Sequence, residues 1–294
     1  MSIGRPLKDQ SATSLSISLS ISVVCFNSSE EELKVLIEST LNAIQLLKDA
    51  TNLASITIHL VDNSEENNLS LQLFASLQKQ IEDLDAQLHL LYGHGNVGYG
   101  AAHNLVIHKM ETDYHLLLNP DLQLDQNCLV AGVKYLAENQ NVAMVSPYAQ
   151  YENGEKQYLC KRYPSVFTFI VRGFFPTILK SLYARRLASF EMHELSESIP
   201  TISIPIISGC FMLCRTKTLQ QVKGFDEKFF LYFEDFDLSL RMAALGKIAY
   251  VPAMRIRHAG GYAASKGWSH IKMFAQSGIR FFNTHGWRFF RQRS

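Results

Sequence analysis

The feature of this chain that most limits its fold is the alternation of apolar, strand-like stretches with amphipathic, helix-like stretches in its first 120 residues. Parallel strands need a crossover connection, and a helix between two strands supplies one. The first such stretch becomes fully apolar, as a strand at the centre of a sheet does. The sequence therefore predicts a mostly parallel, Rossmann-like α/β sheet flanked by helices. We expect strands at 16–26, 55–64, 87–92 and 114–119, and helices at 29–47, 68–81 and about 99–110.

The pattern loosens in the second half, although no internal repeat or clear linker divides the chain. Asn153-Gly154 predicts a hairpin turn. Strand character returns at 202–215 and again at 247–258, where we expect a pair of strands. The stretch 167–190 is aromatic, basic and interrupted by a proline. It is compatible with a mobile or membrane-proximal segment and equally with a plain helical hairpin.

The overall charge is balanced, with 28 Lys and Arg against 27 Asp and Glu and a net charge of +1. A general nucleic-acid binder needs a basic surplus, so we expect no nucleic-acid partner. No apolar run approaches the ~18 residues of a membrane-spanning helix, and no signal peptide is visible at the polar, serine-rich N-terminus. We expect a cytoplasmic protein whose five scattered cysteines are buried, reduced thiols.

The C-terminal stretch 272–294 concentrates positive charge. It contains one lysine, four arginines and six aromatic residues, and no acidic residue. Basic residues mixed with aromatic ones suit contact with anionic lipid, which would make the protein peripheral on the inner face of the cytoplasmic membrane. An ordinary closing helix with a frayed basic end explains the same pattern equally well.

Residues 93–98, GHGNVG, satisfy the G-x-G-x-x-G pattern of dinucleotide-binding turns, after a predicted strand and before a predicted helix. Two features count against that interpretation. The pattern normally lies at the first strand–helix turn, whereas two strand–helix units precede it here. Its acidic partner, about 20 residues further on, would be Asp113, which we expect at the start of a strand. A nicotinamide-dependent oxidoreductase is therefore a minor alternative.

Two carboxylates directly follow predicted strands. Asp62 ends the second strand, and Asp121 follows the fourth in the turn Asn119-Pro120-Asp121. Ligands in open α/β sheets bind beyond the carboxyl ends of the strands, where both side chains are expected. Asp62 is suited to hydrogen bonds from a base or ribose, and Asp121 to a hard divalent cation that also takes phosphate oxygens. The alternatives are a helix cap for Asp62 and a simple turn at Asp121.

Three carboxylates, Glu234, Asp235 and Asp237, are enclosed by phenylalanine and leucine residues in the stretch 230–240. If a helix starts near Glu234, then Glu234 and Asp237 share a face and Asp235 points about 100° away. The helix dipole favours acids in a first turn, but it does not explain why apolar residues enclose them. A carboxylate at the mouth of an apolar pocket is suited to general-base catalysis. Downstream, His258 ends a strand before two glycines and could join a metal or phosphate site.

Together these motifs resemble the inverting family 2 glycosyltransferases of the GT-A fold, over roughly residues 18–262. The matching segments are SVVCFNS for the opening strand, VDNS for the nucleotide-contacting aspartate, GNVGYGAAHN for the segment that lines the donor site and NPD for the metal motif. Residues 208–261 match the acceptor-side block, which runs through the Glu-Asp motif to the closing histidine. The NPD form and the FFLYFEDFD block look most like rhamnosyltransferase-type members, which implies dTDP-rhamnose as the donor.

The resemblance implies a role for each candidate residue. Asp235 would take the proton of an acceptor hydroxyl as it attacks the anomeric carbon from the opposite face, while Glu234 and Asp237 orient the acceptor or the base. Asp121 would hold Mg²⁺ or Mn²⁺ on the diphosphate, with His258 as a second contact. The implied donor-binding residues are Asn27, Asp62, Asn96, Gly98, Tyr99, Asn104 and Asn119.

The same resemblance implies a glycan or a lipid-diphosphate-linked glycan as acceptor, as in the synthesis of bacterial cell-surface polysaccharides such as O-antigen. The resemblance divides the chain into a disordered lead-in at 1–14, a GT-A domain at 15–262 and a basic aromatic helix at 263–294. Within the GT-A domain it implies a nucleotide-binding half at 15–125 and an acceptor half at 126–262, and the acceptor half carries a helical region.

Departures from the family pattern keep other interpretations open. Asn119 replaces the first acid of Asp-x-Asp, which removes one charge from the metal site, while Cys25 and His94 stand where a threonine and a charged residue are expected. The alternatives are a UDP- or GDP-sugar donor, a nucleotidyltransferase and a non-catalytic sugar-nucleotide-binding module. The nucleotidyltransferase would more usually carry a glycine-rich, basic phosphate loop after its first strand, where this chain has CFNSSEEE.

Overall fold

The computed structural model describes residues 16–65, 71–259 and 268–290, so the lead-in expected at 1–14 lies outside the described residues. The strands are β1 (Ile17–Cys25), β2 (Leu53–Asp62), β3 (Ala86–Leu91), β4 (Tyr114–Leu118), β5 (Leu122–Leu124), β6 (Val142–Gln150), β7 (Lys156–Gln157), β8 (Cys160–Lys161), β9 (Thr201–Ile202), β10 (Ile206–Ile207), β11 (Phe211–Arg215) and β12 (Lys247–His258). The helices are α1 (Glu30–Ala50), α2 (Leu71–Asp83), α3 (Tyr99–Ile107), α4 (Cys128–Glu138), α5 (Val166–Phe174), α6 (Thr177–Leu182), α7 (Ala184–Phe190), α8 (Thr216–Gln221), α9 (Glu234–Ala243) and α10 (Trp268–His285).

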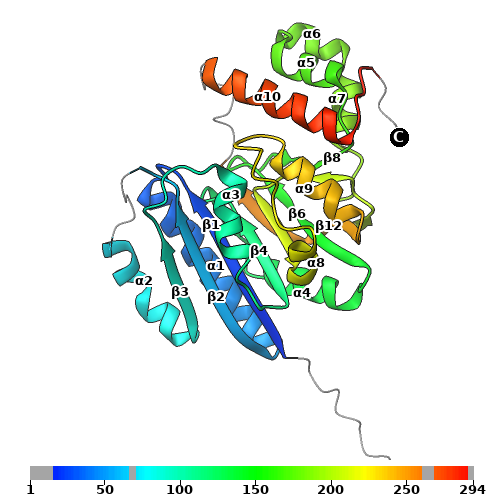
Figure 1. Cartoon of the computed structure of the whole chain (residues 1–294). Coiled ribbons are helices and arrows are strands. Elements are labelled where there is room, and N and C mark those ends of the chain that lie inside the picture. Colours follow the sequence, from blue (N-terminus) through cyan, green and yellow to red (C-terminus); the bar gives the residue numbers. More distant parts are fainter. Residues whose placement is uncertain (1–15, 66–70, 260–267, 291–294) are drawn as a thin grey trace, which may run out of the picture.

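One sheet runs through the molecule in the order β3-β2-β1-β4-β11-β6-β12-β5, with β7 and β9 at its margins (Figure 1). Strands β1 to β4 are parallel neighbours, which confirms the prediction made from the alternating pattern. β11 is inserted antiparallel between β4 and β6, and β5 runs antiparallel to β12. The two predicted halves of the domain therefore contribute strands to the same sheet.

Helices cover both faces of this sheet. α1, α2 and α4 pack on one face, and α3, α8 and α9 on the other. α1 starts with a capping box, in which Ser29 and Glu32 each accept the other's backbone N–H. Its leucine and isoleucine side chains recur at helical spacing and are buried against the sheet. β1 supplies Leu19, Ile21 and Val23 to the same core.

The hairpin predicted at Asn153-Gly154 is confirmed by the antiparallel pairing of β6 and β7. The stretch 247–258 forms one strand rather than the predicted pair, because a register shift between Val251 and Arg255 bends β12 without breaking it. The segment 167–190 forms three short helices, α5 to α7, rather than a two-helix hairpin.

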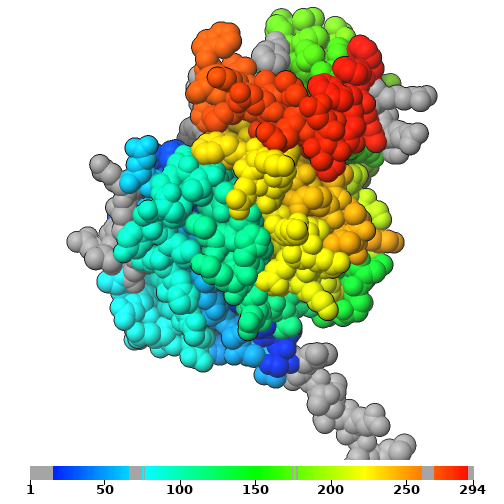
Figure 2. Space-filling view, in the orientation of Figure 1, coloured from blue at the N-terminus to red at the C-terminus, as the bar shows by residue number. Residues whose placement is uncertain are grey.

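α5, α6, α7 and α10 form a helical group at one end of the molecule, where α10 lies across the surface (Figures 1 and 2). Phe281 and Phe282 of α10 are buried against Phe229 and Phe233, which precede α9. The chain after α10 returns to α5, where Val166 donates its backbone N–H to the oxygen of Arg288 at 2.8 Å. The closing helix is thus integral to the fold. In the described residues, no helix has the length and apolar character that crossing a membrane requires.

Replacing Phe281 by alanine is expected to lower the free energy of unfolding by about 3–5 kcal/mol, because removal of a buried ring leaves a cavity. The ring is fully buried, with its centroid 5.4 Å from that of Phe233. The exposed Phe289 is the matched control, and its alanine variant should change this free energy by less than about 0.5 kcal/mol. Chemical denaturation measures both variants, and equal effects would contradict the assignment of α10 to the core.

Candidate active site

Asp62 lies at the end of β2 and is almost fully buried. β1 ends beside it, because Cys25 pairs with Asp62 in the parallel ladder. Oδ1 of Asp62 accepts the backbone N–H of Ser64 at 2.9 Å, and Oγ of Ser64 accepts the backbone N–H of Asn27 at 3.0 Å. Two of the predicted donor-binding residues, Asp62 and Asn27, are therefore brought together beyond the carboxyl ends of neighbouring strands.

The glycine-rich loop before α3 is tied to this edge by Asn63. The Asn63 side chain donates to the backbone oxygen of Gly98 at 3.0 Å and lies 3.0 Å from Nε2 of His94. Oδ1 of Asn96 accepts the N–H of Gly98 at 3.1 Å. Gly98 has a φ of 92°, and a Cβ there would lie 2.5 Å from the backbone oxygen of Phe230. A close approach of two loops thus accounts for this glycine without a dinucleotide.

Two further predicted donor-binding residues hold backbone groups. The Asn104 side chain bonds both the N–H and the oxygen of Phe225 at 2.9 Å, and so fixes α3 to the chain before α9. The backbone N–H of Asn119 donates to the oxygen of Cys210 at 2.9 Å. The structure gives the Asn104 amide a structural task, and its contact with a donor stays a prediction.

Asp121 and His258 meet where β5 begins and β12 ends. β5 pairs with β12, so that His258 lies opposite Leu122, and Nε2 of His258 is 3.2 Å from Oδ2 of Asp121. Nδ1 of His258 is 2.5 Å from Oε1 of Gln157 in β7. When Nε2 binds a cation, Nδ1 must carry the hydrogen, and Gln157 is the group that accepts it.

This pair has the donor chemistry of a magnesium or manganese site that a substrate completes. Mg²⁺ is often held by one or two carboxylates, with phosphate oxygens and water in its other positions. Within the part of the chain that the structure describes, no group of three His, Cys, Asp or Glu side chains could hold a metal ion. A cation here would therefore depend on oxygens of the ligand. A cavity of about 360 Å³ opens beside Asp121, lined in part by Glu31, Glu152 and Arg257.

The acidic cluster lies at the start of α9, which begins at Glu234 as predicted. Glu234 and Asp237 are buried, and Asp235 is part-buried beside them. Oδ2 of Asp235 accepts the backbone N–H of Gly209 at 2.9 Å, and Oδ1 accepts the N–H of Phe236 at 2.9 Å. Each carboxylate oxygen has two lone pairs, so each keeps one for a further donor such as an acceptor hydroxyl.

Asp237 is held within the fold by an ion pair with Arg241 and a hydrogen bond with His285. Its Oδ2 is 2.6 Å from Nη2 of Arg241, and its Oδ1 is 2.8 Å from Nε2 of His285 in α10. Arg241 also donates to the backbone oxygens of Val222 and Gly224 at 2.7 Å. Asp237 thus fixes α9 to α10 and to the preceding loop, and its predicted role in orienting the acceptor or the base stays a prediction.

Burial and charge separate the protonation of Glu234 from that of Asp235. Burial, with a smaller effect from the charge of Asp235, raises the pKa of Glu234 to about 8. Burial also raises the pKa of Asp235, but hydrogen bonds from Gly209 and Phe236 oppose that rise. These hydrogen bonds favour the charged form of Asp235, whereas Glu234 has none from a neighbouring residue among the causes of its shift, so Asp235 is the better suited of the two to accept a proton.

Cys210 lies between the metal-binding candidates and the acidic cluster. Its backbone oxygen holds Asn119, and its neighbour Gly209 holds Asp235. Burial raises the pKa of the Cys210 thiol to about 12, and the charges of Asp121 and Asp235 act in the same direction. The thiol is therefore inert, and the two carboxylates flank one short backbone segment. All five cysteines are buried free thiols, as predicted.

The backbone directly before the acidic cluster is strained. Tyr232 and Phe233 have φ values of 71° and 65°, in the left-handed region that non-glycine residues rarely adopt. Phe233 is buried, with its ring centroid 5.1 Å from that of Phe169 and 5.0 Å from that of Phe274. Packing of these rings from α5 and α10 holds the turn that starts α9.

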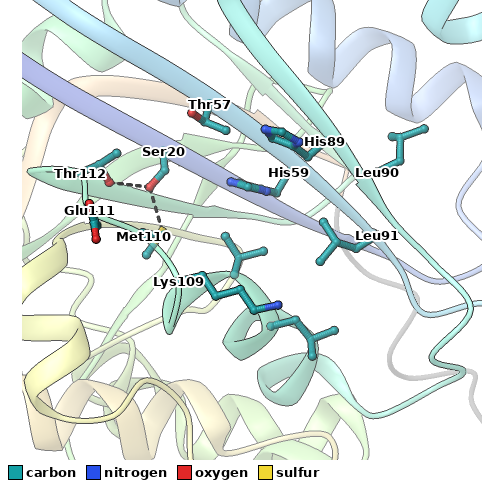
Figure 3. Close-up of a pocket in the computed structure, with 12 residues that line it drawn as sticks. Ser20, Thr57, His59, His89, Leu90, Leu91, Lys109, Met110, Glu111 and Thr112 are labelled. Atoms are coloured by element: carbon teal, nitrogen blue, oxygen red, sulfur yellow. Dashed lines mark hydrogen bonds between the residues drawn. The ribbon is translucent and has the colours of Figure 1, made fainter.

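A cavity of about 410 Å³ lies away from these carboxylates, between the sheet and the end of α3 (Figure 3). His59 and His89, on neighbouring strands, stack on its wall with their ring centroids 5.1 Å apart, and Lys109 and Glu111 line it as well. Burial, with the charge of His89, lowers the pKa of His59 to about 4. None of the predicted site residues lines this cavity.

A mostly parallel sheet, with carboxylates gathered beyond its strand ends and a second acidic group at the start of a covering helix, is typical of an α/β enzyme that binds its ligand at that edge of the sheet. The chain belongs to glycosyl transferase family 2, to which its residues 20–222 match. The predicted family and fold are therefore confirmed, and the chain is a glycosyltransferase.

Known relatives point in the same direction. The chain is 30% identical over 199 residues to the rhamnosyltransferase WbbL of Escherichia coli, which covers 62% of this chain and 68% of WbbL. It is 25% identical over 185 residues to the N-acetylglucosaminyl-diphospho-decaprenol L-rhamnosyltransferase of Mycobacterium tuberculosis, covering 58% of each chain. In fold it resembles the crystal structure of GalNAc-T7 with UDP, GalNAc and Mn²⁺, with a TM-score of 0.62, 13% identity, and coverage of 92% of this chain and 48% of that one.

Sequence reasoning missed Gln157 and Gly209. Gln157 lies in a two-residue strand with no motif around it, and only the pairing of β6 with β7 brings it to His258. Gly209 lies in the acceptor-side block at 208–261, but its bond to Asp235 joins residues that no local sequence pattern connects.

Replacing Gln157 by leucine is expected to weaken Mn²⁺ binding about 10-fold, because the His258 ring loses the acceptor that orients it. Electron paramagnetic resonance of free Mn²⁺, in the presence of dTDP, measures this affinity directly. Gln150→Leu, in the strand paired with β7, is the matched control and should leave the affinity unchanged. Equal affinities in all three proteins would rule out Gln157 as a support of the metal site.

Proposed function

We propose that this glycosyltransferase is inverting and metal-dependent, and that it transfers L-rhamnose from dTDP-rhamnose to a hydroxyl of a glycan or a lipid-diphosphate-linked glycan. The observation that carries the proposal is the position of the Asp235 carboxylate, which Gly209 holds one residue from the backbone oxygen of Cys210 that fixes Asn119. In this proposal the base and the metal-binding carboxylate lie at either side of one short segment, which would hold the acceptor and the donor in a fixed geometry for the displacement.

In the proposed reaction Asp235 accepts the proton of the acceptor hydroxyl while that oxygen attacks the anomeric carbon. Glu234, protonated at neutral pH, keeps a second negative charge away from the base. Asp121 and His258 would hold the divalent cation, which offsets charge on the departing nucleoside diphosphate. Asp62 and Asn27 would bind the nucleoside beyond β1 and β2.

The donor and acceptor are proposed from the printed activities of the relatives. Two of them are rhamnosyltransferases, and the mycobacterial protein is named for an acceptor linked through a diphosphate to a polyprenol. The structure of GalNAc-T7 contains UDP and Mn²⁺. A UDP- or GDP-sugar donor is the second candidate, and Mg²⁺ and Mn²⁺ are the candidate metals.

Asp235→Asn is expected to reduce transfer by at least about 100-fold while leaving dTDP affinity unchanged, since an amide has no basic lone pair at neutral pH. Transfer is measured with each of dTDP-rhamnose, UDP-GlcNAc and GDP-mannose, on a short-chain polyprenyl-diphospho-GlcNAc. Asp226→Asn, a change of a part-buried aspartate in the loop before α9, serves as control, because an amide oxygen can still accept the N–H of Lys228. Wild-type rates in the Asp235 variant would exclude it as the base.

We also propose that the protein is cytoplasmic and peripheral on the membrane that carries its acceptor. The contact predicted at 272–294 is revised, because Phe281 and Phe282 are buried in the core. Support comes instead from the helical group. Its segments 166–190 and 268–290 contain seven Lys and Arg and no acidic residue. The most exposed apolar side chains there are Ile178 at 82%, Leu182 at 76%, Phe290 at 72% and Trp268 at 86%.

The double variant Ile178→Ser and Leu182→Ser is expected to reduce flotation with vesicles of phosphatidylglycerol and phosphatidylethanolamine several-fold, because apolar insertion and charge attraction act together. Leu245→Ser, the same kind of substitution at an exposed leucine beyond α9, is the control. Undiminished flotation of the double variant would remove α6 from the proposed contact.

A further inference from the structure

Gly209 is held from both sides by side chains of two different elements. Its backbone oxygen accepts the hydroxyl of Tyr99 at 2.7 Å, and its N–H donates to Oδ2 of Asp235 at 2.9 Å. Tyr99 begins α3, in the segment expected to line the donor site, whereas Asp235 begins α9. One residue therefore connects the donor segment with the catalytic carboxylate.

Tyr99 itself is fixed in its position. Its backbone N–H donates to the oxygen of Phe230 at 3.1 Å. Its ring packs edge-on against His103, with 4.7 Å between centroids, and against Phe225, with 5.9 Å. Nδ1 of His103 lies 2.7 Å from Oγ of Ser22 in the sheet. The His103 ring, held by Ser22 of the sheet, thus fixes the orientation in which the Tyr99 hydroxyl donates to Gly209.

We propose that Tyr99 is a positioning residue for the general base: its hydroxyl fixes Gly209, and the N–H of Gly209 fixes the Asp235 carboxylate. The inference rests on the proposed function, in which Asp235 is the base. It replaces the direct contact with the donor that the sequence implied for Tyr99.

The absence of a side chain at Gly209 allows its N–H to reach the Asp235 carboxylate. A Cβ there would lie 3.1 Å from Cβ of Asp235 and 3.5 Å from Cε1 of Tyr99. The first distance is too short for an unstrained contact, so any larger residue would push the carboxylate away. Among the described residues, the other hydrogen bonds to the Asp235 carboxylate come from the backbone of Phe236 and of Asp235 itself, both in α9, so the Gly209 bond links the carboxylate to a different part of the chain.

The charges around Asp235 set the sign of the effect. Tyr99, Glu234, Cys210 and Asp121 face this region, and Lys161 is the nearby cation that favours the charged carboxylate. Burial raises the pKa of Tyr99 well above its ordinary value, with these neighbours adding to the rise, so the hydroxyl stays neutral and donates. The Gly209 bond stabilises the charged form of Asp235 and holds its pKa down. Loss of the bond raises that pKa, and activity is then lost at a higher pH.

Tyr99→Phe is the first variant, and the acid limb of its pH–rate profile is expected to move upward by about 0.5–1 pH unit, with kcat reduced about 10-fold. The affinity for dTDP, measured by calorimetry, should stay within about two-fold of wild type. Tyr92→Phe, which removes the hydroxyl of an exposed tyrosine beside the same loop, is the matched control. An unmoved acid limb combined with weakened dTDP binding would overturn the proposal in favour of a donor contact.

Gly209→Ala tests the same connection without changing Tyr99. Its acid limb should move in the same direction, because the added methyl displaces Asp235 from the N–H. A shift in Tyr99→Phe that Gly209→Ala does not share would show that Tyr99 acts by another route, and would also overturn the proposal.

Hydrogen exchange at the Gly209 amide separates this inference from the proposed function. Exchange should be at least about 10-fold faster in Tyr99→Phe than in wild type, because Gly209, no longer held at its backbone oxygen, loses the alignment of its N–H with Oδ2 of Asp235. Unchanged exchange overturns the inference whether or not the protein transfers sugar. If wild-type protein transfers no sugar from any nucleotide donor, the proposed function fails, whereas faster exchange would still establish the connection from Tyr99 to Gly209.

Discussion

The antiparallel insertion of β11 between β4 and β6 is the constraint on which the site depends. Asn119 and Asp121 follow the end of β4, and Gly209 and Cys210 precede β11, so the pairing of the two strands brings these two turns side by side. A ladder of backbone hydrogen bonds fixes that register far more rigidly than a loop contact would. The sheet itself therefore positions Asp121 and the backbone that binds Asp235, the proposed base, and the helices that carry Tyr99 and Asp235 complete the arrangement.

The first half of the fold and the residue types of the site could be predicted from the sequence, because their signals are local. Strand and helix periodicities identified β1 to β4 with their helices, and the spacing of Glu234, Asp235 and Asp237 correctly indicated which two share the buried side of a helix. Partners distant in the chain could not be predicted. No pattern near Asp237 indicates His285, and none near His258 indicates Gln157, since these pairs arise only from tertiary packing.

The C-terminal segment shows why composition alone left two interpretations open. Aromatic residues at helical spacing satisfy a core and a lipid surface equally well, because both exclude water. Only the packing separates Phe281, inside, from Phe290, outside. The same applies to the glycine-rich loop, where a steric need at Gly98 produced a pattern that resembles a nucleotide-binding fingerprint.

The left-handed turn at Tyr232 and Phe233 has a consequence for how the enzyme loses activity. Each such residue costs roughly 1–3 kcal/mol of conformational energy, which the aromatic packing of α5 and α10 must offset. The sheet is not involved in that balance. Mild heat or denaturant that loosens the aromatic cluster would allow the turn to relax and α9 to fray from its first residue, while the sheet stays folded. Inactivation and global unfolding would then be separate events in this protein. The event that needs the lower temperature or denaturant concentration would set the limit of its activity.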